Sequence, residues 1–336
     1  MTSRNILLAE RAFGLLGISI ACWMVYRLGP SRIMANIRSI GWGFLAVTAF
    51  KSAQYLLETL AWMLIASQKN VRMPFWLTFK TVLEGEALNY LTLTRMGGEP
   101  LKAVAFRESL GLARSAAAVI VLKFCNLLGF WLLVCGGFAL ALYSSDLPAD
   151  AKTKISIGIA FFTVMIVSAS WMQRIGLFGP LSWILEKFEA PSEWIREHLR
   201  RLTRLDDHVL ETYRSKPWRI SAAALLCTLS WVEEIFFIWL ALRFLHLNTD
   251  WKSAAVAGSL ALLFNHMLFF VPWRAGTQEG TLVLAFTLLK LSEPAGLSIA
   301  ILKRFREMIW VFAGLILFAM ETLRTPYSWN VQTPAK

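Results

Sequence analysis

Two turns rich in arginine, glycine and glutamate carry the side chains of this sequence that are best suited to bind an anionic group. Residues 95–99 read Arg-Met-Gly-Gly-Glu, and residues 274–280 read Arg-Ala-Gly-Thr-Gln-Glu-Gly. In each copy a lysine, Lys123 or Lys303, follows the glutamate after twenty-three intervening residues. Backbone amides at the start of a helix receive anions with the help of the helix dipole, and a nearby guanidinium adds charge-assisted hydrogen bonds. We therefore expect each turn to offer a site for an anionic group.

Further charged side chains lie inside the apolar runs that follow these turns. Charge in hydrocarbon is costly and usually functional, so we expect these side chains to face a polar interior and to pair with nearby acids. The bases are Lys123, Lys303, Arg304 and Arg306, and the nearby acids are Glu99, Glu279 and Glu307. The predicted substrate-binding residues are Asn89, Arg95, Gly97, Gly98, Glu99, Lys123, Arg274, Gly276, Gln278, Glu279, Gly280, Lys303, Arg304, Arg306 and Glu307.

A comparison of the chain with itself at a shift of 180 residues relates the two turns. Glu99 aligns with Glu279 and Lys123 with Lys303, and the apolar residues before both lysines also match. Glycine and proline break a helix at each turn, and non-helical backbone at membrane depth is tolerated only where it is buried in protein or lines a wet cavity. Paired interrupted segments in corresponding halves point to the binding site of a transporter. The repeat therefore predicts a polar cavity shared by two hairpins.

A purely structural role for the turns stays open. Arg95 with Glu99, and Arg274 with Glu279, could form ion pairs that only hold two hairpins in place. The two glutamates could also act together as acid and base, although nothing in the sequence sets the distance between them.

Two other sets of charged residues lie in apolar runs outside the turns. Lys51 and Glu58, seven residues apart, share one face of a predicted helix, and we expect them to satisfy each other. Glu233 and Glu234 are adjacent in the run 220–245 and are a further candidate for the cavity wall.

The elements that must position these residues are long apolar helices. Of the 336 residues 57% are hydrophobic and 17% charged, against about 25% charged in a soluble domain. Seven runs approach or exceed the roughly 20 residues that a spanning helix needs, and lipid leaves the backbone no partners outside a helix. These runs are 12–28, 43–66, 116–143, 155–172, 220–245, 254–271 and 298–320. The sequence predicts an all-α fold, a polytopic transmembrane helical bundle of about seven to nine helices with two pseudo-repeats that carry interrupted or re-entrant helices.

We interpret residues 1–336 as a single integral membrane domain with two repeats. Repeat 1 spans about residues 74–143, repeat 2 about residues 254–322, and an amphipathic linker covers residues 173–219. Basic residues concentrate in the linker, as they do in cytoplasmic loops, so we place it in the cytoplasm. It is either a basic amphipathic helix on the membrane surface or a solvated helix between two bundles. The same rule assigns the basic segment around Lys102 to the cytoplasmic side.

Several classes of function find no support in the sequence. The net charge of +12 would suggest nucleic acid in a soluble protein, but basic cytoplasmic loops explain it here, so we expect no nucleic-acid partner. The chain has no P-loop and no Gly-x-Ser-x-Gly element, so no catalytic motif is recognised. Neither the four histidines nor the four cysteines have metal-ligand spacing, and we expect no metal or other cofactor.

The two repeats resemble the lysylphosphatidylglycerol synthase transmembrane-region family, also called the flippase-like family, and its hopanoid-associated bacterial members in particular. The similarity lies in Gly-Glu-Ala-Leu-Asn at 85–89, in Phe-Val-Pro at 270–272 and in Lys-Arg-Phe-Arg-Glu at 303–307. Its most specific part is Gly-x-Gln-Glu-Gly at 276–280. The resemblance implies an integral protein of the bacterial inner membrane, similar to the membrane half of two-domain members whose soluble aminoacyltransferase makes the lipid.

The resemblance and the two turns together favour a lipid flippase or transporter-like protein that moves an anionic or lipid-linked substrate between leaflets. Headgroups would enter the polar cavity and contact Arg95, Arg274 and Lys303. Two alternatives stay open, a membrane-embedded enzyme that modifies a lipid, and a non-transporting scaffold that docks a partner through the linker. The expected partners are membrane lipids and, for a scaffold, lipid or envelope biosynthesis enzymes.

Overall fold

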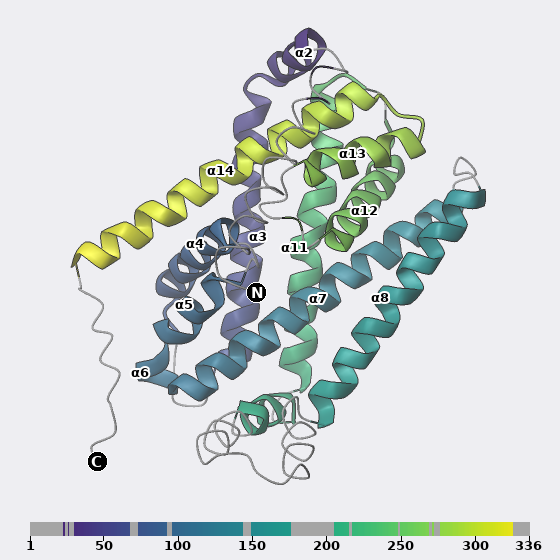
Figure 1. Ribbon diagram of the computed structural model, residues 1–336. Coiled ribbons are helices and arrows are strands. Elements are labelled where there is room, and N and C mark those ends of the chain that lie inside the picture. Colours follow the sequence, from purple (N-terminus) through teal and green to yellow (C-terminus); the bar gives the residue numbers. More distant parts are fainter. Residues whose placement is uncertain are drawn as a thin grey trace, which may run out of the picture.

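The chain folds into an all-α bundle, which confirms the predicted fold class (Figure 1). The structure is a computed structural model, and it describes residues 23, 26, 30–67, 73–92, 96–143, 149–175, 205–214, 217–247, 249–268, 271 and 276–324. Its helices are α2 (Pro30–Ile40), α3 (Gly43–Ala66), α4 (Phe75–Leu91), α5 (Gly98–Ala105), α6 (Arg107–Leu110), α7 (Leu112–Tyr143), α8 (Ala149–Ile175), α11 (Pro217–Phe244), α12 (Trp251–Met267), α13 (Thr277–Leu288) and α14 (Glu293–Arg324). Residues 205–214 form a further short helix.

Two helices in the described part of the chain are long and apolar enough to cross a membrane. They are Leu112–Leu142 within α7, and Pro217–Phe244, which is α11. α14 is as long as α7, at 32 residues, but it carries charged side chains near its middle. The number of spanning helices, predicted as seven to nine, therefore stays a prediction.

The same succession of helices occurs twice along the chain. α3, α4, α5 and α7 correspond in order to α11, α12, α13 and α14 (Figure 1). α4 and α12 are each 17 residues long, and α7 and α14 are each 32. In both copies a glycine turn separates the 17-residue helix from a short helix, α5 or α13, so the interrupted helices of the predicted repeats are present.

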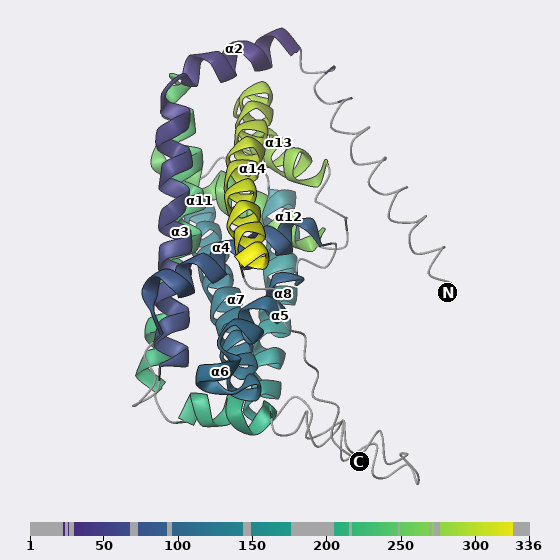
Figure 2. The same cartoon turned by 90° about the vertical axis from the view of Figure 1, so that its left-hand side faces the viewer.

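The two copies have opposite directions in the bundle. Figure 2 shows α3 and α11 side by side. Gly43 at the start of α3 lies against the ring of Phe244 at the end of α11. Near the other ends, the Arg219 guanidinium donates a hydrogen bond of 2.9 Å to the Ser67 carbonyl. Equivalent helices are thus antiparallel, which is the arrangement of inverted repeats in transporters.

Each long helix packs against the 17-residue helix of the other repeat. α7 meets α12 where Gly137 faces Ser259, and α14 meets α4 where Gly314 faces the Leu83 carbonyl. A Cβ at either glycine would lie within 2.5 Å of these partners, so small residues allow the close approach that membrane helices use in place of a hydrophobic driving force. The two repeats are therefore interlocked around a common centre.

The predicted linker, residues 173–219, lies largely outside the described residues. In its described part, the helix 205–214, Val209 is buried and Tyr213 packs edge-to-face on Phe124 of α7, with 6.4 Å between ring centroids. This part of the linker is therefore attached to the bundle.

Candidate functional site

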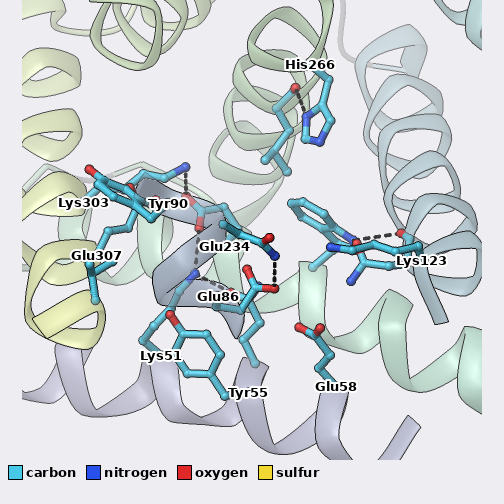
Figure 3. A pocket seen from close by; sticks show the side chains of 16 residues that line it. Lys51, Tyr55, Glu58, Glu86, Tyr90, Lys123, Glu234, His266, Lys303 and Glu307 are labelled. Atoms are coloured by element: carbon cyan, nitrogen blue, oxygen red, sulfur yellow. Dashed lines mark hydrogen bonds and ion pairs between the residues drawn. The ribbon is translucent and has the colours of Figure 1, made fainter. Parts of the chain in front are cut away.

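A polar cavity of about 220 Å³ lies among six helices of the bundle, α3, α4, α7, α11, α12 and α14 (Figure 3). Both repeats contribute to its wall, as the repeated turns predict. Its charged lining consists of Lys51, Glu58, Glu86, Lys123, Glu234, Lys303 and Glu307. In Figure 3 Lys123 and Glu58 lie on one side of the cavity, and Lys303 and Glu307 lie on the other.

One set of charged side chains surrounds Lys102 of α5; we call it the Lys102 group, and it comprises Glu58, Glu86, Glu99, Lys102 and Lys123. The Lys102 ammonium is fully buried and lies 3.0 Å from Glu58, 3.0 Å from Glu86 and 3.8 Å from Glu99. Removing a charge from water costs several kcal/mol unless partners replace the water. Helices α3, α4 and α5 each supply one of these carboxylates, so the ammonium ties them together.

The Glu99 carboxylate connects this group to the first glycine turn. Its Oε1 forms an ion pair with the Lys123 ammonium, at 2.7 Å, and accepts a hydrogen bond from the Asn89 amide, at 2.9 Å. The Asn89 side chain also accepts a hydrogen bond of 2.8 Å from the Gly98 amide, and donates to Glu86 at 3.0 Å. The first amides of a helix lack intrahelical partners, so Asn89 satisfies one at the start of α5. It thereby orients two carboxylates toward the lysines.

Glycine is required where α4 and α5 cross. A Cβ at Gly98 would lie 1.9 Å from the Gly85 carbonyl oxygen, and a Cβ at Gly85 would lie 2.6 Å from Lys102 Cε. The absence of both side chains lets α5 approach α4 closely enough for Lys102 to reach its carboxylates. Gly97 also lies in the turn, where its amide donates a hydrogen bond of 3.1 Å to the Thr92 hydroxyl.

A second set surrounds Arg306 of α14; we call it the Arg306 group, and it comprises Lys51, Glu233, Glu234, Lys303 and Arg306. The guanidinium is fully buried and donates to Glu233 at 2.5 Å and to Glu234 at 2.9 Å. It also lies 3.8 Å from the centre of the Phe237 ring, within the range of a cation–π interaction. Lys303 lies 2.5 Å from Glu234, and Lys51 lies 3.5 Å from Glu233.

The second glycine turn holds a separate ion pair. Gly276 adopts a left-handed backbone conformation, with φ of 74°, and α13 begins at the next residue. Glu279 of α13 accepts a bidentate pair of hydrogen bonds from Arg304 of α14, at 2.6 and 3.0 Å. Arg304 also donates to the Tyr90 hydroxyl at 3.4 Å, which links the turn to α4 of the other repeat.

The predicted residues are therefore only partly gathered at the cavity. Asn89, Lys123, Lys303 and Glu307 line it, whereas Glu99, Glu279, Arg304 and Arg306 hold its walls in place. Gln278 is buried, and its Nε2 has no hydrogen-bond partner among the described residues. A Cβ at Gly280 would meet no atom within 4 Å, so the turn makes no steric demand there. Arg95 and Arg274 lie outside the described residues.

The two repeats pair their aligned glutamates with different bases. Glu99 pairs with Lys123, but Glu279 pairs with Arg304, and Lys303 turns to Glu234 of α11. Adjacent residues of a helix point in directions about 100° apart, so a small rotation of α14 decides which base meets which acid.

One expectation about single residues is wrong. Lys51 and Glu58 do not satisfy each other, because Lys51 contacts α11 carboxylates and Glu58 contacts Lys102. Lys102 itself, in the segment that the charge rule assigns to the cytoplasmic side, has a fully buried side chain beside three carboxylates. Sequence reasoning also missed Glu86. Glu86, like Lys102 and Glu58, lies within or beside an apolar run, and this position could have indicated a functional residue, because charge is rare in such runs without a function.

The electrostatics of the cavity suit a charged or dipolar headgroup. Three ammonium groups, those of Lys51, Lys123 and Lys303, line it together with carboxylates. All three form ion pairs with carboxylates, so an incoming anion would have to displace a carboxylate from one of these ammonium groups. Within the described residues no cluster of three or more His, Cys, Asp or Glu side chains could hold a metal ion.

Comparison with known proteins identifies one related family. The family model described as lysylphosphatidylglycerol synthase TM region matches residues 11–314, which include repeat 1, most of repeat 2 and every charged residue of the cavity wall. No curated protein and no solved structure matches the chain.

Proposed function

Because the chain belongs to the lysylphosphatidylglycerol synthase transmembrane-region family, a membrane family tied to lipid metabolism or transport, we propose that it moves an anionic or lipid-linked substrate between leaflets. The observation that carries this proposal is the polar cavity enclosed by helices of two inverted repeats. A cavity between inverted repeats is where transporters place their substrate site, because either repeat can then open it to its own side.

The Arg306 group is the part of the wall that would receive an anionic headgroup. It contains three bases, Lys51, Lys303 and Arg306, and two carboxylates, and Glu307 lies on the same side of the cavity (Figure 3). Lys51 and Lys303 line the cavity, whereas Arg306 is fully buried behind them. A phosphate would compete with Glu234 for the Lys303 ammonium and would gain charge-assisted hydrogen bonds there. The acyl chains would stay in lipid, since only the headgroup needs shielding from hydrocarbon.

We favour transport over chemical modification of a lipid. An acid and base acting together need adjacent carboxyls with different protonation states, whereas Glu99 and Glu279 each bind a different base on a different long helix. The proposed partners are therefore membrane lipids. We further propose a location in the bacterial inner membrane with the segment 173–219 in the cytoplasm.

A leaflet-exchange assay with purified full-length protein in liposomes tests the proposal. Fluorescent phospholipid in the outer leaflet is bleached by an impermeant reductant, so exchange appears as additional bleaching. Lys303→Gln should slow exchange at least tenfold, because it removes a cavity ammonium while keeping a side chain of similar length. Lys154→Gln is the matched control, since among the described residues Lys154 pairs only with Asp150, and both side chains are exposed on α8. Equal exchange rates in wild type, Lys303→Gln and protein-free liposomes would refute transport.

A further inference from the structure

The charges of the Lys102 group do not balance. Among the described residues it contains three carboxylates and two ammonium groups, so with every group ionised it has one surplus negative charge. The Arg306 group contains three bases and two carboxylates, and Glu307 of the cavity lining lies on the same side as Lys303, so that side has no surplus (Figure 3). Lys123 and Glu58 of the Lys102 group lie across the cavity from Lys303 (Figure 3). The surplus negative charge therefore lies on carboxylates that are at most 28% exposed.

The three carboxylates of the Lys102 group have different sets of polar partners. Glu86 accepts hydrogen bonds from Lys102 and Asn89. Glu99 accepts one from Asn89 and forms an ion pair of 2.7 Å with Lys123, although its Oε2 is buried and has no hydrogen-bond partner among the described residues. Within the same part of the chain Glu58 accepts only from Lys102, at 3.0 Å, and its side chain is only 5% exposed. A buried carboxylate is stable when donors replace its lost water. Glu58 thus has the fewest polar partners of the three, and unlike Glu99 it lines the cavity.

The groups that face Glu58 come from every helix packed around it. They are Tyr55 on α3 itself, Glu86 on α4, Glu99 and Lys102 on α5, Lys123 on α7 and the thiol of Cys227 on α11. Glu86 and Glu99 compete with Glu58 for the ammonium groups of Lys102 and Lys123. In a medium of low dielectric constant, binding a proton removes the surplus negative charge at a smaller cost than keeping it.

We propose that Glu58 carries a proton while the cavity is empty and releases it when a cationic group enters. In that step the carboxyl O–H bond breaks, the proton passes to water in the cavity, and the ammonium of the ligand replaces it as the counter-charge. When the ligand leaves, the Glu58 carboxylate takes a proton from water and the first state returns. If the proposed transport function holds, this exchange couples movement of an amine-bearing headgroup to movement of a proton in the opposite direction.

Infrared spectroscopy of the purified full-length protein tests the protonated carboxyl directly. A protonated carboxylic acid has a C=O stretching band that a carboxylate lacks. The wild type should show this band at neutral pH, and Glu58→Gln should lose it while the matched variant Glu211→Gln, at an exposed position, keeps it. Glu58→Asp, which retains a carboxyl, should keep a shifted band even if Glu58→Gln folds poorly. A band that survives Glu58→Gln, or one that Glu86→Gln removes instead, overturns the assignment.

Proton release on ligand binding tests the exchange. Dioctanoyl phosphatidylethanolamine, which carries an ammonium, is added to weakly buffered protein with a pH indicator. Dioctanoyl phosphatidylglycerol, which has a phosphate but no amine, is the control. We expect the first lipid to release about one proton per chain from wild type and none from Glu58→Gln, and the second to release none from either. Equal release by both lipids, or release from Glu58→Gln, overturns the exchange.

These measurements separate this inference from the proposed function. If the infrared band is present but no lipid crosses the bilayer in the leaflet-exchange assay, transport is refuted and the protonated carboxyl stands. If lipid crosses the bilayer but the band is absent, the assignment of the proton to Glu58 is refuted and transport stands.

Discussion

The Gly98→Ala substitution tests whether the close crossing of α4 and α5 positions the charges of the cavity. A Cβ at residue 98 would lie 1.9 Å from the Gly85 carbonyl oxygen and 2.4 Å from its carbon. Ordinary contacts begin near 3.4 Å, so the two helices must separate by about 1.5 Å. Both clashing atoms belong to the backbone, and no rotation of a side chain can relieve them. The helix α5 itself therefore has to move.

This separation has a cost in stability and in geometry. Overpacking a close-packed interface costs about 3 kcal/mol when the backbone must shift, which lowers the Tm of a chain of this size by roughly 5 °C. Lys102 lies on α5, and its hydrogen bonds of 3.0 Å to Glu58 and Glu86 do not survive a displacement of about 1.5 Å. We therefore expect Gly98→Ala to lose lipid exchange together with thermal stability.

A thiol-reactive dye provides the stability assay. Cys125 and Cys227 are fully buried, whereas Cys135 is half-buried, so the assay uses proteins in which Cys22 and Cys135 are replaced by serine. The two remaining thiols react only when the bundle opens, and dye fluorescence against temperature reports the Tm. Gly280→Ala is the control, because a Cβ there meets no atom within 4 Å and alanine is favoured over glycine in a helix by up to about 1 kcal/mol. The control should keep or slightly raise the Tm. A Gly98→Ala protein with the Tm and exchange rate of wild type would refute the positioning role of this crossing.

Two further predictions concern stability in other parts of the bundle. Arg306→Met leaves the buried carboxylates of Glu233 and Glu234 without their guanidinium and should lower the free energy of unfolding by about 3 kcal/mol. Adding Glu233→Gln should restore part of this loss. An unchanged Tm in the dye assay contradicts the pairing. Asp250→Ala removes the N-cap of α12 and should cost about 1 kcal/mol. Hydrogen bonding from Ser253 holds the pKa of the Asp250 carboxyl below its ordinary value, so the cap stabilises above that ordinary value and is lost as the pH falls through the lowered pKa. The Tm difference between Asp250→Ala and wild type should therefore shrink in acid, and a constant difference across pH would contradict this linkage.

Much of the fold could be predicted because the signals are local. Apolar runs of membrane-spanning length predict helices, and the glycine turns predict the breaks before α5 and α13. The repeat was visible because the two copies keep the same spacing from glutamate to lysine. The cavity followed from one physical expectation, that charges within apolar runs must face a polar interior.

The pairing of charges could not be predicted in the same way. Lys102 meets Glu58 across 44 residues of sequence, and Arg306 meets Glu233 across 73. Each partner depends on how a helix is rotated about its axis and how closely it approaches its neighbour, and both are set by packing between segments distant in the chain. The full burial of Lys102 therefore could not be predicted from its local sequence.

The sequence by itself thus determined that the chain is a helical membrane protein with two related halves and with charged residues inside its apolar helices. The tertiary structure alone decided that the halves are inverted, that their charges form two groups, and that the group with a surplus carboxylate borders a cavity. The physical reason is that hydropathy and turn chemistry act over a few residues. The balance of charge around a buried site depends instead on every helix that reaches it.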